Sequence, residues 1–71
     1  MTTDTTNRVL GLAQAYIVGL NGPEWLKMGL QRYSSKPSFM GRVDRLIGDE
    51  SIVEERAVEM VLEEYLLSLK I

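Results

Sequence analysis

The segment from Asp49 to Ile71, DESIVEERAVEMVLEEYLLSLKI, decides the fold. Counted at about 100° per residue, its apolar side chains fall on one broad arc of a helix and most of its charged side chains fall on the opposite arc. The arc holds two stripes, one of Val58, Leu62, Tyr65 and Leu69 and one of Val53, Met60 and Leu67. The pattern predicts a long amphipathic C-terminal helix.

The start of this helix carries two signals. Ser51 followed by Glu54 fits a capping box, in which each side chain bonds a backbone N–H of the first turn. The acidic residues around them suit the positive end of the helix dipole. We therefore expect the helix to begin at Asp49 or Ser51 and to run to the C-terminus.

Three further helical patterns precede it, separated by Gly and Pro. Residues 1–7 are polar and without periodicity, which predicts a flexible N-terminus followed by a single helical domain over residues 8–71. The first pattern extends to Leu20, the second covers about 23–33, and the third is short and ends at Gly48. No stretch alternates with a period of two. The expected fold is all-α, a compact bundle of about four helices, two of them short.

The width of the C-terminal apolar arc and the small size of the chain together favour a homodimer. The arc covers roughly 200°, whereas a surface helix needs a stripe of about 100° for its own core. A chain of 71 residues also has a marginal core, and without Cys or His it lacks disulfides and zinc sites of the usual kind. The expected interface consists of Val58, Val61, Leu62, Tyr65 and Leu69.

Charge is divided unevenly along the chain. Residues 1–48 hold six basic and three acidic side chains, a net charge of +3, whereas residues 49–71 hold two basic and seven acidic side chains, a net charge of −5. Either the halves pack with complementary charge, or the first half offers a basic surface to an acidic partner. The candidate partner-binding residues are Trp25, Lys27, Arg32, Lys36, Arg42 and Arg45. As the sole Trp of a small chain, Trp25 is expected either in the core, which its size favours, or as an interface anchor.

The residue inventory argues against an enzyme. Without His or Cys, a nucleophile would need Lys, Asp or Glu as its base. Ser34, Ser35 and Ser38 lie near Lys36, but Ser is also expected around a proline turn. Glu55, Glu59 and Glu63 repeat every four residues, which is more typical of a solvated face than of a metal site. There is no phosphate-binding glycine loop, so we expect neither a catalytic site nor a cofactor or metal.

Two functions remain for a chain of this make-up, which we expect to be cytoplasmic because it has no long apolar run. The first is a small non-enzymatic regulatory or adaptor protein that binds another protein, as small inhibitors, antitoxin-like proteins and phage-encoded modulators of similar size do. The alternative is a DNA-binding regulator that uses the second and third helices as a helix-turn-helix. The sequence pI of about 5.0 and the position of Asp44 between two Arg disfavour DNA.

Overall fold

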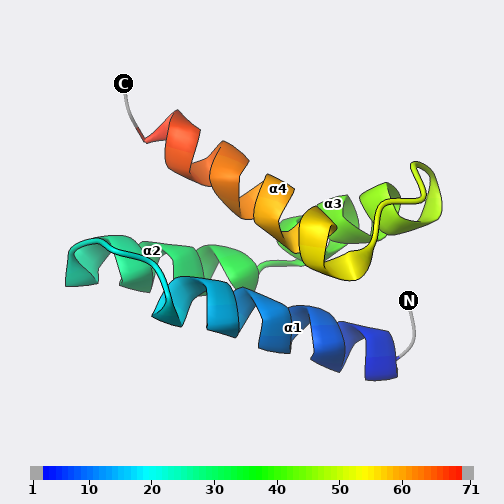
Figure 1. The fold of residues 1–71 in the computed structure, drawn as a ribbon, viewed down its shortest axis with the longest axis horizontal. Helices are drawn as coiled ribbons and strands as arrows, with labels where there is room; N and C mark the ends of the chain where they lie inside the picture. The colour runs from blue at the N-terminus through cyan, green and yellow to red at the C-terminus, as the bar shows by residue number, and fades with distance from the viewer. Residues whose placement is uncertain (1–2, 70–71) are drawn as a thin grey trace.

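The computed structural model describes residues 3–69, which form four α-helices joined by short connections (Figure 1). The described residues contain no strand, as the sequence predicted. The helices are α1 (Thr3–Val18), α2 (Glu24–Ser34), α3 (Pro37–Gly48) and α4 (Glu54–Ser68). The all-α fold is therefore confirmed, while the last two residues of the expected C-terminal helix lie outside the described range.

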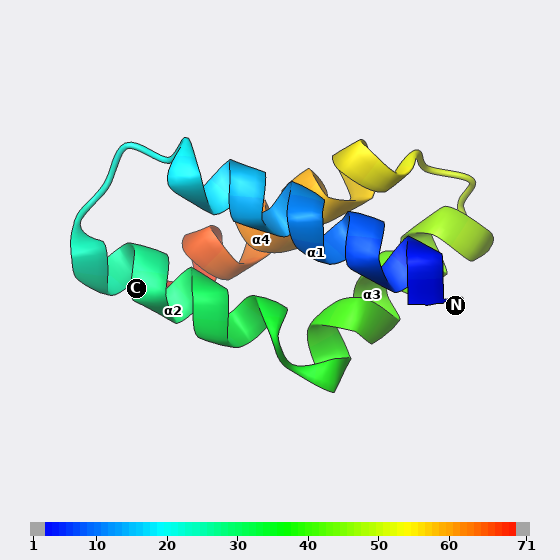
Figure 2. The ribbon, with the colours of Figure 1, turned by 90° about the horizontal axis from the view of Figure 1, so that it is seen from below.

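The bundle is built around α4. The first two helices run side by side in opposite directions, and α3 continues from α2 toward the other end of the molecule (Figures 1 and 2). From the α3 end, α4 passes back over the α1–α2 pair, antiparallel to α2, and it contacts each of the other three helices. The helix with the widest apolar arc thus contacts every other helix, as α2 also does.

The core is continuous and lies between these four helices. Its fully buried side chains are Val9, Ala13, Ile17, Leu30, Phe39, Val43, Ala57, Val58, Val61 and Leu62. In α1 they recur every four residues, at Val9, Ala13 and Ile17, which places them on one face of the helix. The accessible surface of 4770 Å² is close to the about 4,500 Å² expected of a compact monomer of this mass. The single chain therefore covers its own core.

The ends of the middle helices follow the proline and glycine signals. Pro23 is the N-cap of α2, and its carbonyl accepts the N–H of Leu26 at 3.1 Å. Pro37 occupies the first turn of α3, where its missing N–H removes no helical hydrogen bond. These ring-restricted residues set both helix starts locally, so the sequence located them well.

The first helix begins earlier than expected. Residues 1–7 were predicted to be flexible, but α1 is already helical at Thr3. Asp4 lies in its first turn, where a carboxylate stabilises the positive end of the helix dipole. One turn later, Nη2 of Arg8 donates a hydrogen bond to Oγ1 of Thr5 at 3.3 Å. These interactions favour helix in a segment that has no apolar periodicity.

The fourth helix begins later than expected, and the predicted capping box does not form. The N-cap is Val53, which makes no side-chain cap, and Ser51 lies outside the helix with a φ of 54°. The N–H of Ile52 instead donates to the carbonyl of Leu46 at 3.0 Å, and the half-buried Ile52 side chain packs against the core. Tertiary burial of Ile52 thus outweighs the local capping signal, which is worth only about 1 kcal/mol.

Candidate functional site

The expected dimer interface on α4 is largely core. Val58, Val61 and Leu62 are fully buried by the other helices of the same chain, so their assignment to a subunit interface is corrected. Tyr65 is half-buried and stacks on Tyr33 of α2, with ring centroids 4.5 Å apart. Leu69 alone of the five is exposed. Three helices of the same chain pack against α4 and cover the middle of its apolar arc, whereas Val53, Leu67 and Leu69 at its two ends stay exposed.

Several large apolar side chains instead remain exposed at one end of the molecule. The turn between α1 and α2 and the C-terminal end of α4 lie at the same end of the long axis (Figures 1 and 2). The exposed residues from these segments are Val18, Trp25, Met28, Leu67 and Leu69. Leu10 and Val53 are also exposed, on α1 and at the start of α4. Apolar side chains that gather in one region mark a binding surface more often than scattered ones do.

The most regular part of this region lies on α2. Trp25, Met28 and Arg32 are spaced by three and four residues, which aligns them along one side of a helix. We call these three residues the outer stripe of α2. Trp25 is 67% exposed, Met28 is 46% exposed, and Arg32 is exposed as well. The stripe is apolar in the first half of the helix and basic in the second.

The preferred expectation that Trp25 lies in the core is wrong. The inward face of α2 is set by Leu30, which is fully buried, and by Tyr33, which packs against Tyr65 and Phe39. Trp25 lies about 140° around the helix from the fully buried Leu30 and so points away from the core. Periodicity placed Trp25 at the edge of the apolar face, but only the packing decides whether an edge residue is covered.

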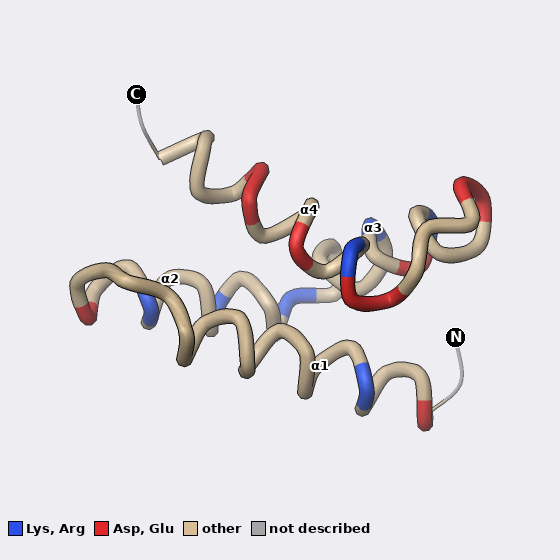
Figure 3. Tube along the Cα trace, in the orientation of Figure 1, with Lys and Arg blue, Asp and Glu red and all other residues tan. Residues whose placement is uncertain are grey.

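The basic candidate residues separate into two groups. Arg42 forms an ion pair with Glu64 of α4, so its charge is used to join α3 and α4. Within residues 3–69, Lys27, Arg32, Lys36 and Arg45 take part in no ion pair. Figure 3 shows basic positions along α2 and acidic positions along α4. Complementary packing between the halves therefore accounts for Arg42, whereas exposed Arg32 and Lys36 lie along and just beyond the outer stripe.

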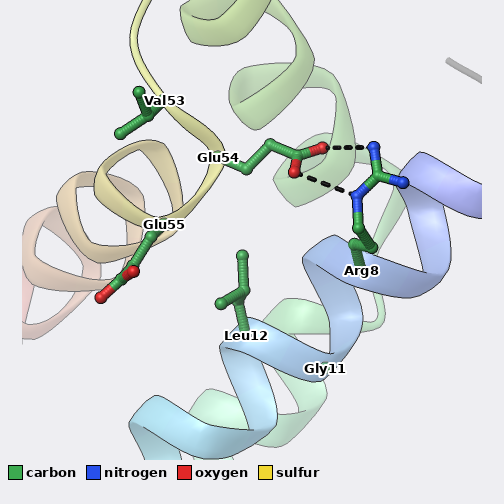
Figure 4. A pocket seen from close by; sticks show the side chains of 6 residues that line it. All are labelled: Arg8, Gly11, Leu12, Val53, Glu54 and Glu55. Carbon is green, nitrogen blue, oxygen red and sulfur yellow. Dashed lines mark hydrogen bonds and ion pairs between the residues drawn. The ribbon is translucent and has the colours of Figure 1, made fainter.

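A hollow of about 520 Å³ lies between α1 and the start of α4 (Figure 4). Arg8, Gly11, Leu12, Val53, Glu54 and Glu55 line it. The guanidinium of Arg8 donates two hydrogen bonds to Glu54, each of 3.1 Å, in a bidentate pair between the two helices. These lining residues offer no nucleophile beside a base, and the charged pair is already satisfied. The Arg8–Glu54 pair, which we call the clasp, therefore joins α1 to α4. The hollow beside it is a weak candidate for a catalytic or binding site.

Two pKa shifts follow from packing around α4. The hydrogen bond from Arg8, assisted by its positive charge, lowers the pKa of the Glu54 carboxyl below its ordinary value. Burial raises the pKa of the Tyr16 phenol, and the negative charges of Glu63 and Glu59 raise it further. The two carboxylates that act on Tyr16 thus lie on the side of α4 that faces α1, away from the outer stripe of α2.

The two remaining chemical possibilities find no support in the geometry. In the proline turn, Oγ of Ser34 donates to the carbonyl of Gln31 at 2.9 Å, and Oγ of Ser35 donates to that of Arg32 at 2.7 Å. These hydroxyls therefore terminate α2, as turn serines do. On α4, the acidic repeat at positions 55, 59 and 63 makes no cluster of three ligating side chains among the described residues.

None of the described helices is long and apolar enough to cross a membrane. The chain matches no protein-family model, no curated protein and no solved structure. Among the described residues, the outer stripe of α2 is the strongest candidate site.

Proposed function

We propose that this chain is a small, non-enzymatic regulatory or adaptor protein that binds a partner protein through the outer stripe of α2. The exposure of its only tryptophan carries the proposal. An indole that is 67% exposed on a regular helix keeps a large apolar surface in water, although the same helix has a buried face available. Trp and Arg are the residues most enriched at protein-binding hot spots, and Met is enriched at interfaces.

The position of the stripe also favours recognition. The outer residues project from a helix whose inner face is fixed by Leu30 and by the Tyr33–Tyr65 stack. A rigid backbone lowers the conformational entropy lost on binding, because only side chains need to be ordered. From the set predicted from the sequence we keep Trp25, Arg32 and Lys36 as partner-binding residues and add Met28. Lys27, Arg42 and Arg45 do not belong to the outer stripe, and Arg42 is paired with Glu64.

The DNA-binding alternative has weaker support. A helix-turn-helix domain needs several cations directed at phosphates and a recognition helix with free polar side chains. On α3, Arg42 is paired with Glu64 and Arg45 follows Asp44 directly. DNA affinity that falls steeply with added salt would favour the alternative, since phosphate contacts release counterions.

Self-association stays a prediction, but its expected location changes. The homodimer was placed on α4 because the arc was too wide for one chain, and Val58, Val61 and Leu62 are in fact covered by that chain. A second copy would therefore have to bind an exposed apolar surface apart from the outer stripe of α2, such as the one that Leu10 or Val53 provides. Sedimentation equilibrium at micromolar concentrations tests this directly.

The proposed function is tested by affinity capture from the native host, using the wild-type chain and two variants. Trp25→Ala with Met28→Ala removes the apolar part of the stripe, whereas Val53→Ala removes an equally exposed side chain at the opposite end of α4. We expect the double variant to lose the captured protein and Val53→Ala to retain it. Retention by the double variant, with helicity unchanged in both, would refute the proposed surface.

A further inference from the structure

We propose that the surface on α2 receives an acidic amphipathic α-helix of the partner protein. This inference rests on the proposed function and specifies the chemistry of the partner. Its basis is the order of side chains along the outer stripe, in which Trp25 and Met28 are followed by Arg32, together with Lys36, the N-cap of α3, four residues further along the chain. A ligand that fits must be apolar at one end and negatively charged at the other.

The positive end of the surface is free to act on a ligand. Arg32 and Lys36 are both exposed, and neither takes part in an ion pair within the described part of the chain. The nearby acidic helix α4 does not neutralise them, because Glu64 is held by Arg42 and Glu63 by Arg56 at 3.6 Å. A carboxylate brought by a partner would therefore meet an uncompensated cation, which favours acidic over basic ligands.

Exposed apolar side chains at this end of the molecule are not confined to α2. A Cβ on Gly29 would lie 3.3 Å from the hydroxyl of Tyr65, so α2 and α4 approach closely there. The C-terminal end of α4 then rises away from α2 but stays at the same end of the long axis as the start of α2 (Figure 1). Leu69, the C-cap of α4, is 44% exposed. It therefore adds exposed apolar surface at the end of the molecule where α2 begins.

The dimensions of the stripe favour a helical ligand. From Trp25 to Arg32 the helix rises about 10.5 Å, which equals two turns of a partner helix lying alongside. Apolar anchors at positions i and i+3 or i+4 of such a helix would meet Trp25 and Met28, and an acidic residue at i+7, two turns from the first anchor, would lie against Arg32. Packing of one helix along another needs no exposed sheet edge and no deep pocket, and residues 3–69 form no strand to supply an edge.

The test uses two synthetic peptides of about 15 residues, each stapled to hold a helix. Both carry leucine anchors at positions i and i+4. At position i+7, which lies opposite Arg32, one peptide has Glu and the other has Lys. Trp25 is the only tryptophan, so its emission reports binding at the stripe. We expect the acidic peptide to bind about tenfold more tightly than the basic one and to shift the Trp25 emission to the blue.

Charge reversal on the protein provides the decisive variant. Arg32→Glu with Lys36→Glu should invert the preference, so that the basic peptide binds more tightly. The matched control is Lys27→Glu with Arg45→Glu, which makes the same change of net charge away from the stripe and should keep the acidic preference. Circular dichroism checks that both double variants remain folded.

Four outcomes would overturn the inference. Equal affinity for the two peptides would make the surface purely apolar, and an unchanged preference in the Arg32→Glu, Lys36→Glu variant would place the charge recognition elsewhere. Binding of neither peptide would exclude a short helix as the ligand, and a blue-shifted Trp25 emission that depends on protein concentration would identify a second copy as the occupant. Affinity capture with the Trp25→Ala, Met28→Ala variant tests the proposed function separately, because it does not depend on either peptide.

Discussion

The rings of Tyr33 and Tyr65 stack 4.5 Å apart between centroids, with only 9° between their planes. Tyr33 also meets the edge of Phe39 at 5.6 Å and 71°. These contacts connect α2, α3 and α4 at one point, beside Gly29. The stack holds α2 in place against α4 and leaves the outer stripe of α2 facing away from the core.

Replacement of Tyr65 by Ala should therefore destabilise the whole fold, because the Tyr65 ring joins α4 to α2. We expect a loss of about 2 kcal/mol in the free energy of unfolding, less than for a fully buried aromatic because Tyr65 is half-buried. Tyr65→Phe keeps the stacked ring and should cost under about 0.5 kcal/mol. Urea denaturation measures both, and equal losses for the two variants would mean that the hydroxyl, and not the ring, provides the stability.

Alanine substitution at Gly29 should show how tightly α2 and α4 pack. Gly to Ala inside a helix normally stabilises by about 1 kcal/mol. At Gly29 the new Cβ would lie 3.3 Å from the Tyr65 hydroxyl, so we expect that gain to be cancelled. In a Tyr65→Phe background the obstacle is gone and the gain should return.

Gly41 supplies the control for this comparison. It lies inside α3, and a Cβ added to it would have no other atom within 4 Å. Gly41→Ala should therefore raise the free energy of unfolding by about 1 kcal/mol in thermal or urea denaturation. A full gain at Gly29 in the wild-type background would show that α2 and α4 pack more loosely than the Gly29–Tyr65 approach implies.

The ion pair between Arg42 and Glu64 should contribute to stability, whereas neighbouring Arg45 should not. Arg42→Glu places two carboxylates together and should lower the free energy of unfolding by about 0.5–1 kcal/mol, a small value because both side chains are about half exposed. Arg45→Glu should leave it within about 0.5 kcal/mol of the wild type. Equal destabilisation by both would indicate a general charge effect and not the specific pair.

The clasp between Arg8 and Glu54 should make stability depend on pH in acid. Because Arg8 lowers the pKa of Glu54 in the folded chain, the ionised carboxylate stabilises the fold above its ordinary pKa of about 4.3. That contribution is lost as the pH falls through the lowered pKa of the folded state. The stability difference between the wild type and Glu54→Gln should therefore shrink in acid.

Thermal denaturation between neutral and strongly acidic pH measures this difference. Glu55→Gln is the matched control, since Glu55 is adjacent in sequence but takes part in no ion pair among residues 3–69. A gap between the wild type and Glu54→Gln that stays constant with pH would show that the clasp does not depend on the carboxylate charge.

Signals that act within a few residues of sequence could be read correctly. Pro23 and Pro37 set the starts of α2 and α3 because their rings restrict the backbone locally. The Ser51–Glu54 signal is also local, but it competed with burial of Ile52 and lost.

Side-chain burial and ion pairing depend on neighbouring helices, and they could not be predicted from the sequence. The sequence shows the width of the apolar arc on α4 but not how much of it the three other helices cover, and for that reason it wrongly places Val58, Val61 and Leu62 in a subunit interface. The exposure of Trp25, at the edge of the apolar face of α2, likewise depends on how the other helices pack. The structure, and not the sequence, shows that Arg42 is paired with Glu64, whereas Arg32 and Lys36 form no ion pair among residues 3–69.

The most direct test of the account is the fluorescence of Trp25 in the free, folded protein. If the outer stripe of α2 is a free binding surface, the indole is in water at every protein concentration where the chain is folded and unbound. We expect a red-shifted emission that is readily quenched by acrylamide and hardly changes when urea unfolds the chain. A blue-shifted, protected emission in the folded chain that moves to the red on unfolding would contradict the account, because Trp25 would then be covered already.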